Sequence, residues 1–457
     1  MRVSSISNKF IVENGKRFEG KYYLNDNSFL SMQIECLQGE TCRLSTIADV
    51  FNPPVFKRQF CKATERSVPY FQSSNVPVVS EFSDVYVFKK QASSLNLLVK
   101  KGDILITGFG TIGNIRVVSK YQDGVCYANN VCRVRLNDDE NTGYVYAFLS
   151  SKYGYAQLNK NASGSVVRYI EAPGIKKLII PILDSSLVES VNKDINESVK
   201  LKETATELLT SAIQILSEYI NTDYKKVQFK TGRISSKQIL NSLQYRLDPP
   251  AIINDGVLTM KTVLENYKTR TISSLDDVKV YRPGIFKRNY VKEGIPYIKG
   301  SEIFLSDPFK RCDQVSKTRT PFIEEMSLKE GQILVTCAGS VGDIKLITKE
   351  YQDFHSIGSQ DIIRIESSDT VFSKEYLFVY LQLPFVYDYI QSMKYGSVIE
   401  RVEPFHIESI PVVVPPSEVV GKINATIEKY MKAMYDSYIL ENKAIQRIEH
   451  EIERNNR

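Results

Sequence analysis

The chain has 457 residues, of which 42% are hydrophobic and 25% charged, a balance typical of soluble globular proteins with more than one domain. Its formal net charge of +6 permits an anionic partner such as nucleic acid, whereas seven scattered cysteines and three histidines argue against a metal centre or a histidine-based triad. The sequence contains neither an apolar run long enough for a membrane span nor a signal peptide, so we expect no membrane association and a cytoplasmic location.

The sequence repeats itself at an offset of about 230 residues. The segment "KKGDILITGFGTIGNIRVVSKYQD" (100–123) aligns with "KEGQILVTCAGSVGDIKLITKEYQD" (329–353), and "NPPVFKR" (52–58) aligns with "RPGIFKR" (282–288). Further on, the segment that begins "GSVVRYIEAPG" at Gly164 aligns with "GSVIERVEPFH" from Gly396. A period of this length is too long for a solenoid repeat and indicates a duplicated domain.

Short strand patterns predominate in the body of each copy, and longer helical patterns at residues 142–160 and 373–393 interrupt them. The strand patterns are β-branched or alternating runs between Gly, Asp and Asn turns. They lie at residues 85–90, 103–108, 115–120 and 132–136 in the first copy, and at residues 332–337, 344–349 and 361–366 in the second. The sequence therefore predicts an α+β fold in which one mixed domain is used twice.

Each copy closes with a long helical pattern whose apolar residues recur every three or four positions. A helix of some 35 residues would be about 50 Å long, more than one such domain needs, so we interpret the two helices as paired spacers. Packing of each helix on its own domain is the alternative. We divide the chain into a first domain (1–185), a first spacer helix (186–222), a linker with the second domain (223–415) and a second spacer helix (416–457).

The segment Gly108-Phe-Gly110-Thr-Ile-Gly113 spells the G-x-G-x-x-G of a dinucleotide-binding loop. In the second copy Cys337 replaces the first glycine. A strand pattern follows the loop in both copies, whereas a dinucleotide site needs a helix whose N-terminus holds the pyrophosphate. We therefore expect no cofactor on this chain, and assign tight strand-to-strand turns that need positive φ or close backbone approach to Gly110, Gly113, Gly339 and Gly342.

The segment "FNPPVF" from Phe51 resembles the catalytic motif of amino-methylating DNA methyltransferases, in which an aromatic residue follows Asn-Pro-Pro. Here Val55 stands in the aromatic position, and the second copy has Arg282 in place of Asn52. We also find no S-adenosylmethionine loop between a strand and a helix. We therefore expect no catalytic residue in this chain.

Basic residues recur at matched positions in the two copies, which favours phosphate contacts over their usual role as solvated surface. Two late loops, residues 161–169 and 394–401, add Ser and Arg that can hydrogen-bond base edges, although many loops of this composition have no such role. The two copies differ in net charge. Residues 31–185 hold about five more basic than acidic residues, whereas residues 262–415 hold about two fewer basic than acidic residues. The candidate DNA contacts are Lys57, Arg58, Arg116, Ser165, Arg168, Lys287, Arg288, Lys345, Ser397 and Arg401.

Two non-identical halves, each with a G-D-I-L-x-T-like block, a G-x-x-G turn, a late Gly-Ser, an "IPI" or "IPVVVPP" segment and a long helix, resemble the specificity (S) subunit of Type I restriction-modification systems. The resemblance implies two target recognition domains in a pseudo-two-fold arrangement, each reading half of a split double-stranded DNA site. It further implies antiparallel spacer helices that dock two methyltransferase subunits, which hold the S-adenosylmethionine.

By the same resemblance the chain itself is non-catalytic, a restriction and motor subunit can join the complex, and the source is bacterial or archaeal. Two alternatives stay open. One is the recognition subunit of a Type IIB-like system, in which the partner fuses methylation and cleavage. The other is an S-like adaptor that does not read DNA productively.

Overall fold

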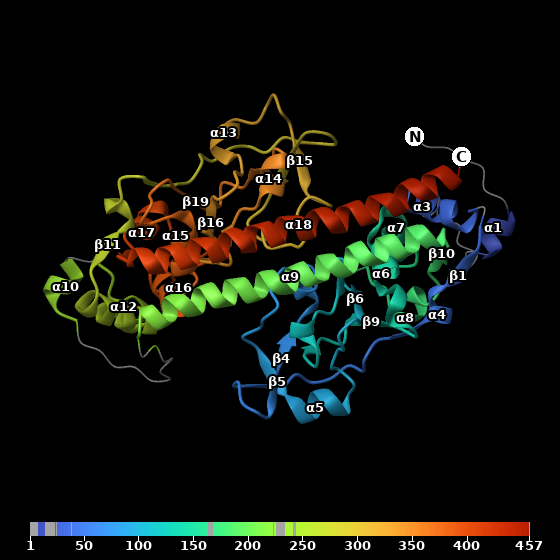
Figure 1. The fold of residues 1–457 in the computed structure, drawn as a ribbon, viewed down its shortest axis with the longest axis horizontal. Helices are drawn as coiled ribbons and strands as arrows, with labels where there is room; N and C mark the ends of the chain where they lie inside the picture. Colours follow the sequence, from blue (N-terminus) through green and yellow to red (C-terminus); the bar gives the residue numbers. More distant parts are fainter. Residues whose placement is uncertain are drawn as a thin grey trace. The chain divides into compact units, whose positions relative to one another are not determined.

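The computed structural model describes residues 8–13, 23, 25–37, 39–162, 168–222, 224, 234–240 and 244–456. The chain divides into two compact units (Figure 1). Unit 1 comprises Met1–Glu203 and Asp436–Arg457, and unit 2 comprises Thr204–Tyr435. Both long helices therefore contribute to both units. None of the helices in these ranges combines the length and the apolar character that crossing a membrane requires.

Unit 1 is built on three small sheets with strand orders β2-β9-β6-β7, β3-β5-β4-β8 and β1-β10. All neighbouring strands are antiparallel except β4 and β8, which are parallel. The strands are β1 (Thr41–Arg43), β2 (Ala48–Phe51), β3 (Phe60–Cys61), β4 (Ser67–Phe71), β5 (Tyr86–Phe88), β6 (Ile104–Thr107), β7 (Ile115–Val117), β8 (Cys126–Tyr127), β9 (Val131–Leu136) and β10 (Ile179–Pro181).

Helices surround these sheets, and the predicted helical pattern at residues 142–160 forms two of them. Ser151 separates the two because its side chain accepts the Gly154 N–H (3.3 Å) and so caps a new helix. The helices of unit 1 are α1 (Asn8–Glu13), α3 (Asp26–Glu35), α4 (Leu44–Ile47), α5 (Lys89–Ser94), α6 (Thr142–Ser150), α7 (Lys152–Lys160) and α8 (Ala172–Ile175), with 3-10 turns at η1 (Ser73–Asn75), η2 (Lys120–Gln122) and η3 (Asp139–Asn141).

Unit 2 repeats the three sheets strand for strand, in the orders β12-β19-β16-β17, β13-β15-β14-β18 and β11-β20, and its single parallel pair, β14 with β18, matches that of unit 1. The strands are β11 (Thr269–Thr271), β12 (Val278–Tyr281), β13 (Tyr290–Val291), β14 (Ile295–Ile298), β15 (Asp313–Val315), β16 (Ile333–Thr336), β17 (Ile344–Leu346), β18 (Ile357–Gly358), β19 (Ile362–Ser367) and β20 (Pro411–Val413). The duplicated α+β fold predicted from the repeat is thereby confirmed.

The helical pattern at residues 373–393 is also split, because Pro384 cannot donate a backbone hydrogen bond and begins a new helix. The helices of unit 2 are α10 (Ser236–Leu240), α11 (Pro249–Ile253), α12 (Asp255–Asn266), α13 (Ile323–Met326), α14 (Lys349–Asp353), α15 (Lys374–Leu381), α16 (Pro384–Ser392) and α17 (Pro404–Glu408), with a 3-10 turn at η4 (Ile272–Ser274).

The two long helices are α9 (Ser185–Tyr219) and α18 (Ser417–Asn455), drawn in green and red in Figure 1. Within unit 1 they run antiparallel, since Arg447 of α18 contacts Ser190 and Asp194 of α9 while Ser437 contacts Ser198. The paired-helix interpretation describes only part of this arrangement. The apolar stripes of both helices also enter the core of unit 1's own body through Val191, Ile195, Ala444, Ile445, Ile448 and Ile452.

A fully buried arginine joins two sheets in each unit. Arg133 of β9 donates to four carbonyl oxygens, and Arg364 of β19 donates to the four at the matching positions. Burial lowers the pKa of each guanidinium to about 10, so both remain charged at neutral pH. The carbonyl acceptors are Leu97, Tyr127, Ala128 and Val131 in unit 1, and Met326, Gly358, Ser359 and Ile362 in unit 2.

Candidate nucleic-acid interface

The loop that follows β2 in unit 1 and β12 in unit 2 has the same construction in both units, and we call it the Phe-Lys-Arg loop (residues 52–58 and 282–288). In unit 1, Phe56 packs edge-on against Tyr70 with ring centres 6.4 Å apart, and the Arg58 guanidinium lies 5.8 Å from the Tyr70 ring centre. Cation–π contacts of this kind hold an arginine in place without removing its charge.

In unit 2, Phe286 packs edge-on against Tyr297 at 6.3 Å, and the Arg288 guanidinium lies 5.6 Å from the Tyr297 ring centre. Arg288 Nε also donates to the Tyr297 hydroxyl at 2.8 Å. Lys57 and Lys287, one residue before each arginine, are exposed. Each unit therefore presents an exposed lysine beside an arginine whose position its tyrosine sets.

An exposed aliphatic side chain precedes these cations in each loop. Val55 is 87% exposed and its counterpart Ile285 is 79% exposed.

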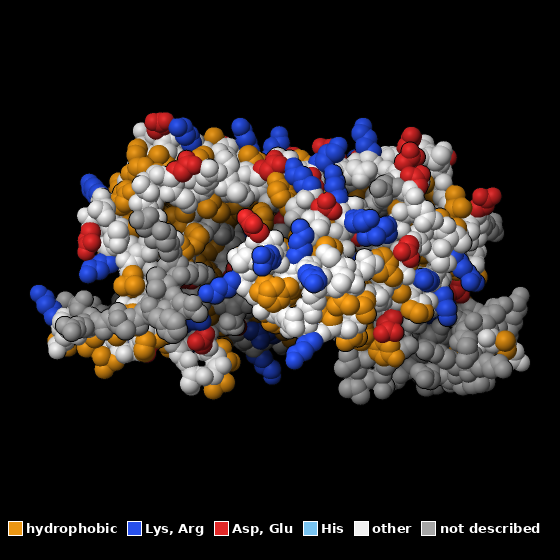
Figure 2. Space-filling model, turned by 90° about the horizontal axis from the view of Figure 1, so that it is seen from below, with side chains coloured by type: hydrophobic (Ala, Val, Ile, Leu, Met, Phe, Trp, Pro, Cys, Tyr) orange, Lys and Arg blue, Asp and Glu red, His pale blue; other side chains and the backbone are white. Residues whose placement is uncertain are grey.

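The chain segments that contain the two loops differ in net charge. Residues 52–102 expose eight Lys or Arg against two Asp or Glu, while residues 282–331 expose seven against four. Figure 2 shows Lys and Arg side chains on one face of the molecule, interspersed with Asp and Glu side chains and with hydrophobic and uncharged surface. Unit 1 therefore offers an anionic ligand the stronger electrostatic attraction.

In unit 1 the glycine turn (108–113) meets the late loop (168–172), and we call this meeting point the loop junction of the unit. Ile170 N donates to Gly108 O at 2.8 Å, and Phe109 forms a β-bridge with Tyr169. Asn52 ties the Phe-Lys-Arg loop to the same place, because its Oδ1 accepts Ala172 N at 2.8 Å. Its Nδ2 donates to the backbone carbonyl of Asn129 at 3.3 Å. The Asn that resembled a catalytic residue thus has both ends of its amide engaged in holding loops together.

The loop junction of unit 2 repeats this backbone pattern between residues 337–342 and 400–403. Val402 N donates to Cys337 O at 3.0 Å, and Ala338 forms a β-bridge with Arg401. The tie to the Phe-Lys-Arg loop is now an ion pair, with Arg282 Nη2 3.1 Å from Glu403 Oε2. The backbone arrangement is therefore shared, while the side chains at the junction differ.

The glycine turns are hairpin turns between antiparallel strands, β6 with β7 and β16 with β17. All four glycines assigned to these turns have φ in the left-handed region: Gly110 (+72°), Gly113 (+81°), Gly339 (+78°) and Gly342 (+88°). A strand rather than a helix follows each turn, so the positively polarised helix N-terminus of a dinucleotide site is absent from these two described segments.

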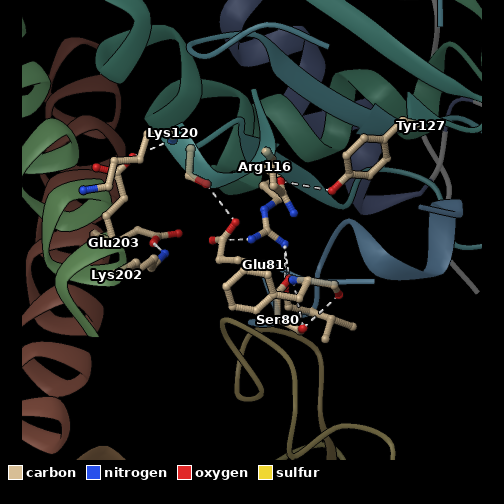
Figure 3. A network of polar contacts seen from close by, with 12 residues as sticks. Ser80, Glu81, Arg116, Lys120, Tyr127, Lys202 and Glu203 are labelled. Carbon is tan, nitrogen blue, oxygen red and sulfur yellow. Dashed lines mark hydrogen bonds and ion pairs between the residues drawn. The ribbon is translucent and has the colours of Figure 1, made fainter. Parts of the chain in front are cut away.

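Arg116 and Lys345, which follow the glycine turns, point into the protein. Arg116 Nη2 lies 2.5 Å from Glu81 Oε1, and the second oxygen of Glu81 accepts the Ser119 hydroxyl at 2.8 Å (Figure 3). Lys345 is buried, and burial lowers the pKa of its ammonium while the charge of Glu350 raises it. Both residues have internal roles, so we do not carry them into the proposed DNA interface.

The late loops hold the remaining sequence-based candidates. Arg168 is exposed and donates to the backbone and side-chain oxygens of Asn159. Ser397 is exposed near the tip of a short hairpin closed by Tyr395 and Arg401, whose backbones exchange hydrogen bonds of 3.0 and 2.9 Å. Ser165 lies outside the described residues.

Sequence reasoning missed the residues that organise this surface. Tyr70 and Tyr297 position the arginines, and their signal was the aligned pair "VPYF" and "IPYI", which repeats a tyrosine at matched positions. Phe109 and Tyr169 also went unnoticed because 60 residues separate them in the sequence and only the fold brings them together.

Comparisons with known proteins found similar solved structures and one matching family model. The S subunit of the Type I restriction-modification system of M. genitalium is 12% identical, with a TM-score of 0.39 over 92% of this chain and 96% of that chain. The HsdS subunit of Thermoanaerobacter tengcongensis is 12% identical, with a TM-score of 0.27 over 89% and 95%. No curated protein matches the sequence.

The family model described as the Type I restriction modification DNA specificity domain matches residues 37–184 and again residues 265–450. The two matched segments each contain one copy of the sequence repeat, and together they cover well over half of the chain. The chain therefore belongs to the family of Type I restriction-modification DNA specificity proteins.

Proposed function

We propose that this chain is the specificity subunit of a Type I restriction-modification complex, in which each unit reads one half of a bipartite double-stranded DNA site. The observation that carries the proposal is the recurrence of the Phe-Lys-Arg loop on its tyrosine in both units, beside loop junctions whose side chains differ. A shared cationic loop suits the DNA backbone, which is the same at every site, and divergent side chains suit two different half-sites.

Lys57 and Arg58 in unit 1, and Lys287 and Arg288 in unit 2, contact phosphates in this proposal. Phosphate contacts fix the register of a protein on the duplex and require cations at defined positions. The Tyr70 and Tyr297 rings hold the guanidinium groups of Arg58 and Arg288 at such positions. Base reading falls to the late loops, through Arg168, Ser397 and Arg401, with Ser165 as a candidate on sequence grounds.

The exposed faces of α9 and α18 dock two methyltransferase subunits, which bring the S-adenosylmethionine and the chemistry, and a restriction and motor subunit can join them. In α9 the exposed positions are polar and recur with helical spacing, as at Glu189, Lys193, Lys200 and Glu207, while the apolar positions turn inward. Such a face suits a partner that binds through ion pairs and hydrogen bonds.

The chain itself contributes no catalytic group in this proposal. The structural use of Asn52 supports this, because its amide is engaged by two backbone groups rather than presented to a base. Burial also raises the pKa of the Cys126 and Cys132 thiols to about 12 and that of Cys337 to about 11, so these cysteines are poor nucleophiles at neutral pH.

The methylome of the source cell tests the proposal, with the gene intact, deleted and restored on a plasmid. We expect one methylated motif of two short half-sites around a fixed spacer to disappear on deletion and to return with the wild-type gene. A methylome that does not depend on the gene, despite co-purification of the chain with a methyltransferase, would indicate an adaptor and contradict the proposal.

A further inference from the structure

We infer that the two side chains at the β-bridge of each loop junction read a base pair, and that the chemistry of the bridge differs between the units. In unit 1 the stacked pair Phe109–Tyr169 reads the methyl group of a thymine. In unit 2 Arg401, beside Ala338, reads a guanine. The inference rests on the proposed function and names the side chains that distinguish the two half-sites.

The backbone at the two bridges is the same. In unit 1 the bridge joins Phe109 to Tyr169, and in unit 2 it joins Ala338 to Arg401, at positions that the sequence repeat aligns. In each case the residue before the bridge on the glycine turn accepts a backbone N–H from the late loop, at 2.8 Å in unit 1 and 3.0 Å in unit 2. The fold thus presents two neighbouring side chains at one fixed place in both units and varies only their identity.

The pair in unit 1 is aromatic and exposed. Phe109 is 36% exposed and Tyr169 is 37% exposed, and their rings stack with centres 5.5 Å apart at 13°. Stacking makes the two rings one flat apolar surface beside polar loops. Aromatic surface of this kind forms apolar contacts with the C5-methyl group of thymine, which only the A·T pair displays in the major groove.

The pair in unit 2 has a different chemistry, because a small residue stands beside an arginine. The acidic residues around Arg401 are engaged elsewhere, since Glu400 pairs with Lys394 at 2.6 Å and Glu403 pairs with Arg282 at 3.1 Å. Within the described ranges no ion pair involves Arg401 itself. Its guanidinium therefore has donors to offer, and bidentate donation from arginine to O6 and N7 is the commonest way to select guanine.

The bridges lie next to the loops that we assign to phosphates. In unit 2, Asp361 connects the two, because its carboxylate lies 3.8 Å from Arg288 Nη2 and its carbonyl accepts Cys337 N at 3.3 Å. In unit 1, Asn130 takes the matching position and its carbonyl accepts Gly108 N at 3.3 Å. A base-reading pair beside a backbone-binding loop is the arrangement that recognition of a duplex requires.

The test compares methylomes produced by the complete complex that carries wild-type or variant chain. Replacing both aromatic residues (Phe109→Ala with Tyr169→Ala) should lower discrimination about ten- to hundredfold at one thymine of one half-site, with the other half-site and the spacer unchanged. Arg401→Gln should relax one guanine of the other half-site. Phe88→Ala, which removes an exposed phenylalanine of β5 that is not part of the loop junction, serves as the matched control and should leave the motif intact.

An exchange variant covers the case in which the double alanine variant fails to fold. Ala338→Phe with Arg401→Tyr moves the aromatic pair to unit 2 and should convert the guanine preference there into a thymine preference. If the wild-type chain produces no bipartite motif, the proposed function itself fails. If it produces one and Arg401→Gln and the exchange variant leave both half-sites unaltered, the inference about the bridges is overturned while the proposed function stands.

Discussion

The hydroxyl groups of Ser198 on α9 and Ser437 on α18 lie 2.9 Å apart, and each also lies within 3.0 Å of the other residue's backbone carbonyl oxygen. Both side chains are buried. Small residues at this point allow the two helix backbones to approach closely, and the two buried hydroxyls hydrogen-bond to each other and to the facing carbonyl oxygens. This contact fixes the helix pairing in unit 1.

Enlarging either serine should therefore destabilise unit 1. We expect Ser198→Val to lower the free energy of unfolding by about 1–3 kcal/mol, because the added methyl groups overpack the contact and the Ser437 hydroxyl loses a partner. Urea denaturation followed by circular dichroism measures the change. Ser217→Val, at an exposed position of the same helix, controls for the lower helix propensity of valine. An equal effect at the two positions would contradict the role of the contact.

Replacing either buried arginine should be more damaging. Arg133→Met and Arg364→Met each remove the donors to four buried carbonyl oxygens, so we expect each to cost about 3 kcal/mol or more of unfolding free energy. Chemical denaturation of the two variants provides the measurement, with Arg43→Met as the control on an exposed arginine. Losses below 1 kcal/mol would mean that other donors or water replace the guanidinium.

Salt dependence should separate phosphate contacts from structural cations. Lys57→Ala with Arg58→Ala should weaken binding of the assembled complex to all DNA sequences and reduce the slope of log affinity against log salt by about 2, as loss of two phosphate contacts requires. Arg116→Met should leave that slope unchanged and instead destabilise unit 1, because it strands the buried Glu81 carboxylate. Binding titrations at four salt concentrations decide between these outcomes, and an unchanged slope for the double variant would remove Lys57 and Arg58 from the interface.

If the long helices set the distance between half-sites, lengthening both of them should change the spacer alone. We propose inserting seven helix-forming residues after Glu203 in α9 and seven after Tyr435 in α18, where the chain passes between the units. Seven residues add about 10 Å of helix, which corresponds to about three base pairs of DNA. The methylome should then show both half-sites unchanged around a longer spacer. A motif with the original spacer would refute this role of the helices.

Unit 2 should lose stability in mild acid through His406. This histidine is buried, its Nδ1 accepts the Glu403 N–H at 2.9 Å, and its ring stacks on Tyr395. Burial lowers the pKa of His406 below its usual 6.5, and the charge of Arg246 lowers it further, against the opposing effect of Glu403. The unfolded chain therefore binds the proton more readily, and this contribution to stability is complete above pH 6.5 and declines as the pH falls toward the folded pKa.

His406→Asn keeps an acceptor for the Glu403 N–H but cannot be protonated in this range. Urea denaturation at pH 7.5 and pH 5.0 should show a smaller loss of stability on acidification in the variant than in the wild-type chain. Equal losses in the two proteins would show that His406 takes no part in the acid sensitivity.

Local sequence patterns determined much of the architecture. The repeat, the strand patterns, the glycine turns and the two long helices depend on residues close together in the chain, where periodicity and backbone preference act directly. The glycines at 110, 113, 339 and 342 were predictable because a turn with positive φ selects glycine wherever it occurs. The helical patterns at residues 142–160 and 373–393 are each divided into two helices by a local signal, a capping serine at Ser151 and a proline at Pro384.

Tertiary structure alone decided which charges are buried and which side chains meet. Arginine and lysine usually lie at the surface, yet Lys345 is buried and Arg116 points inward. Arg116 does so because it pairs with Glu81, 35 positions earlier in the chain. Arg133 and Arg364 take three of their four carbonyl acceptors from residues two to six positions before them. The fourth acceptor, Leu97 or Met326, lies 36 or 38 positions away, so only the folded unit completes the set. The same holds for Phe109 and Tyr169, whose meeting requires closure of the long intervening chain, so their identity as a pair is a property of the fold.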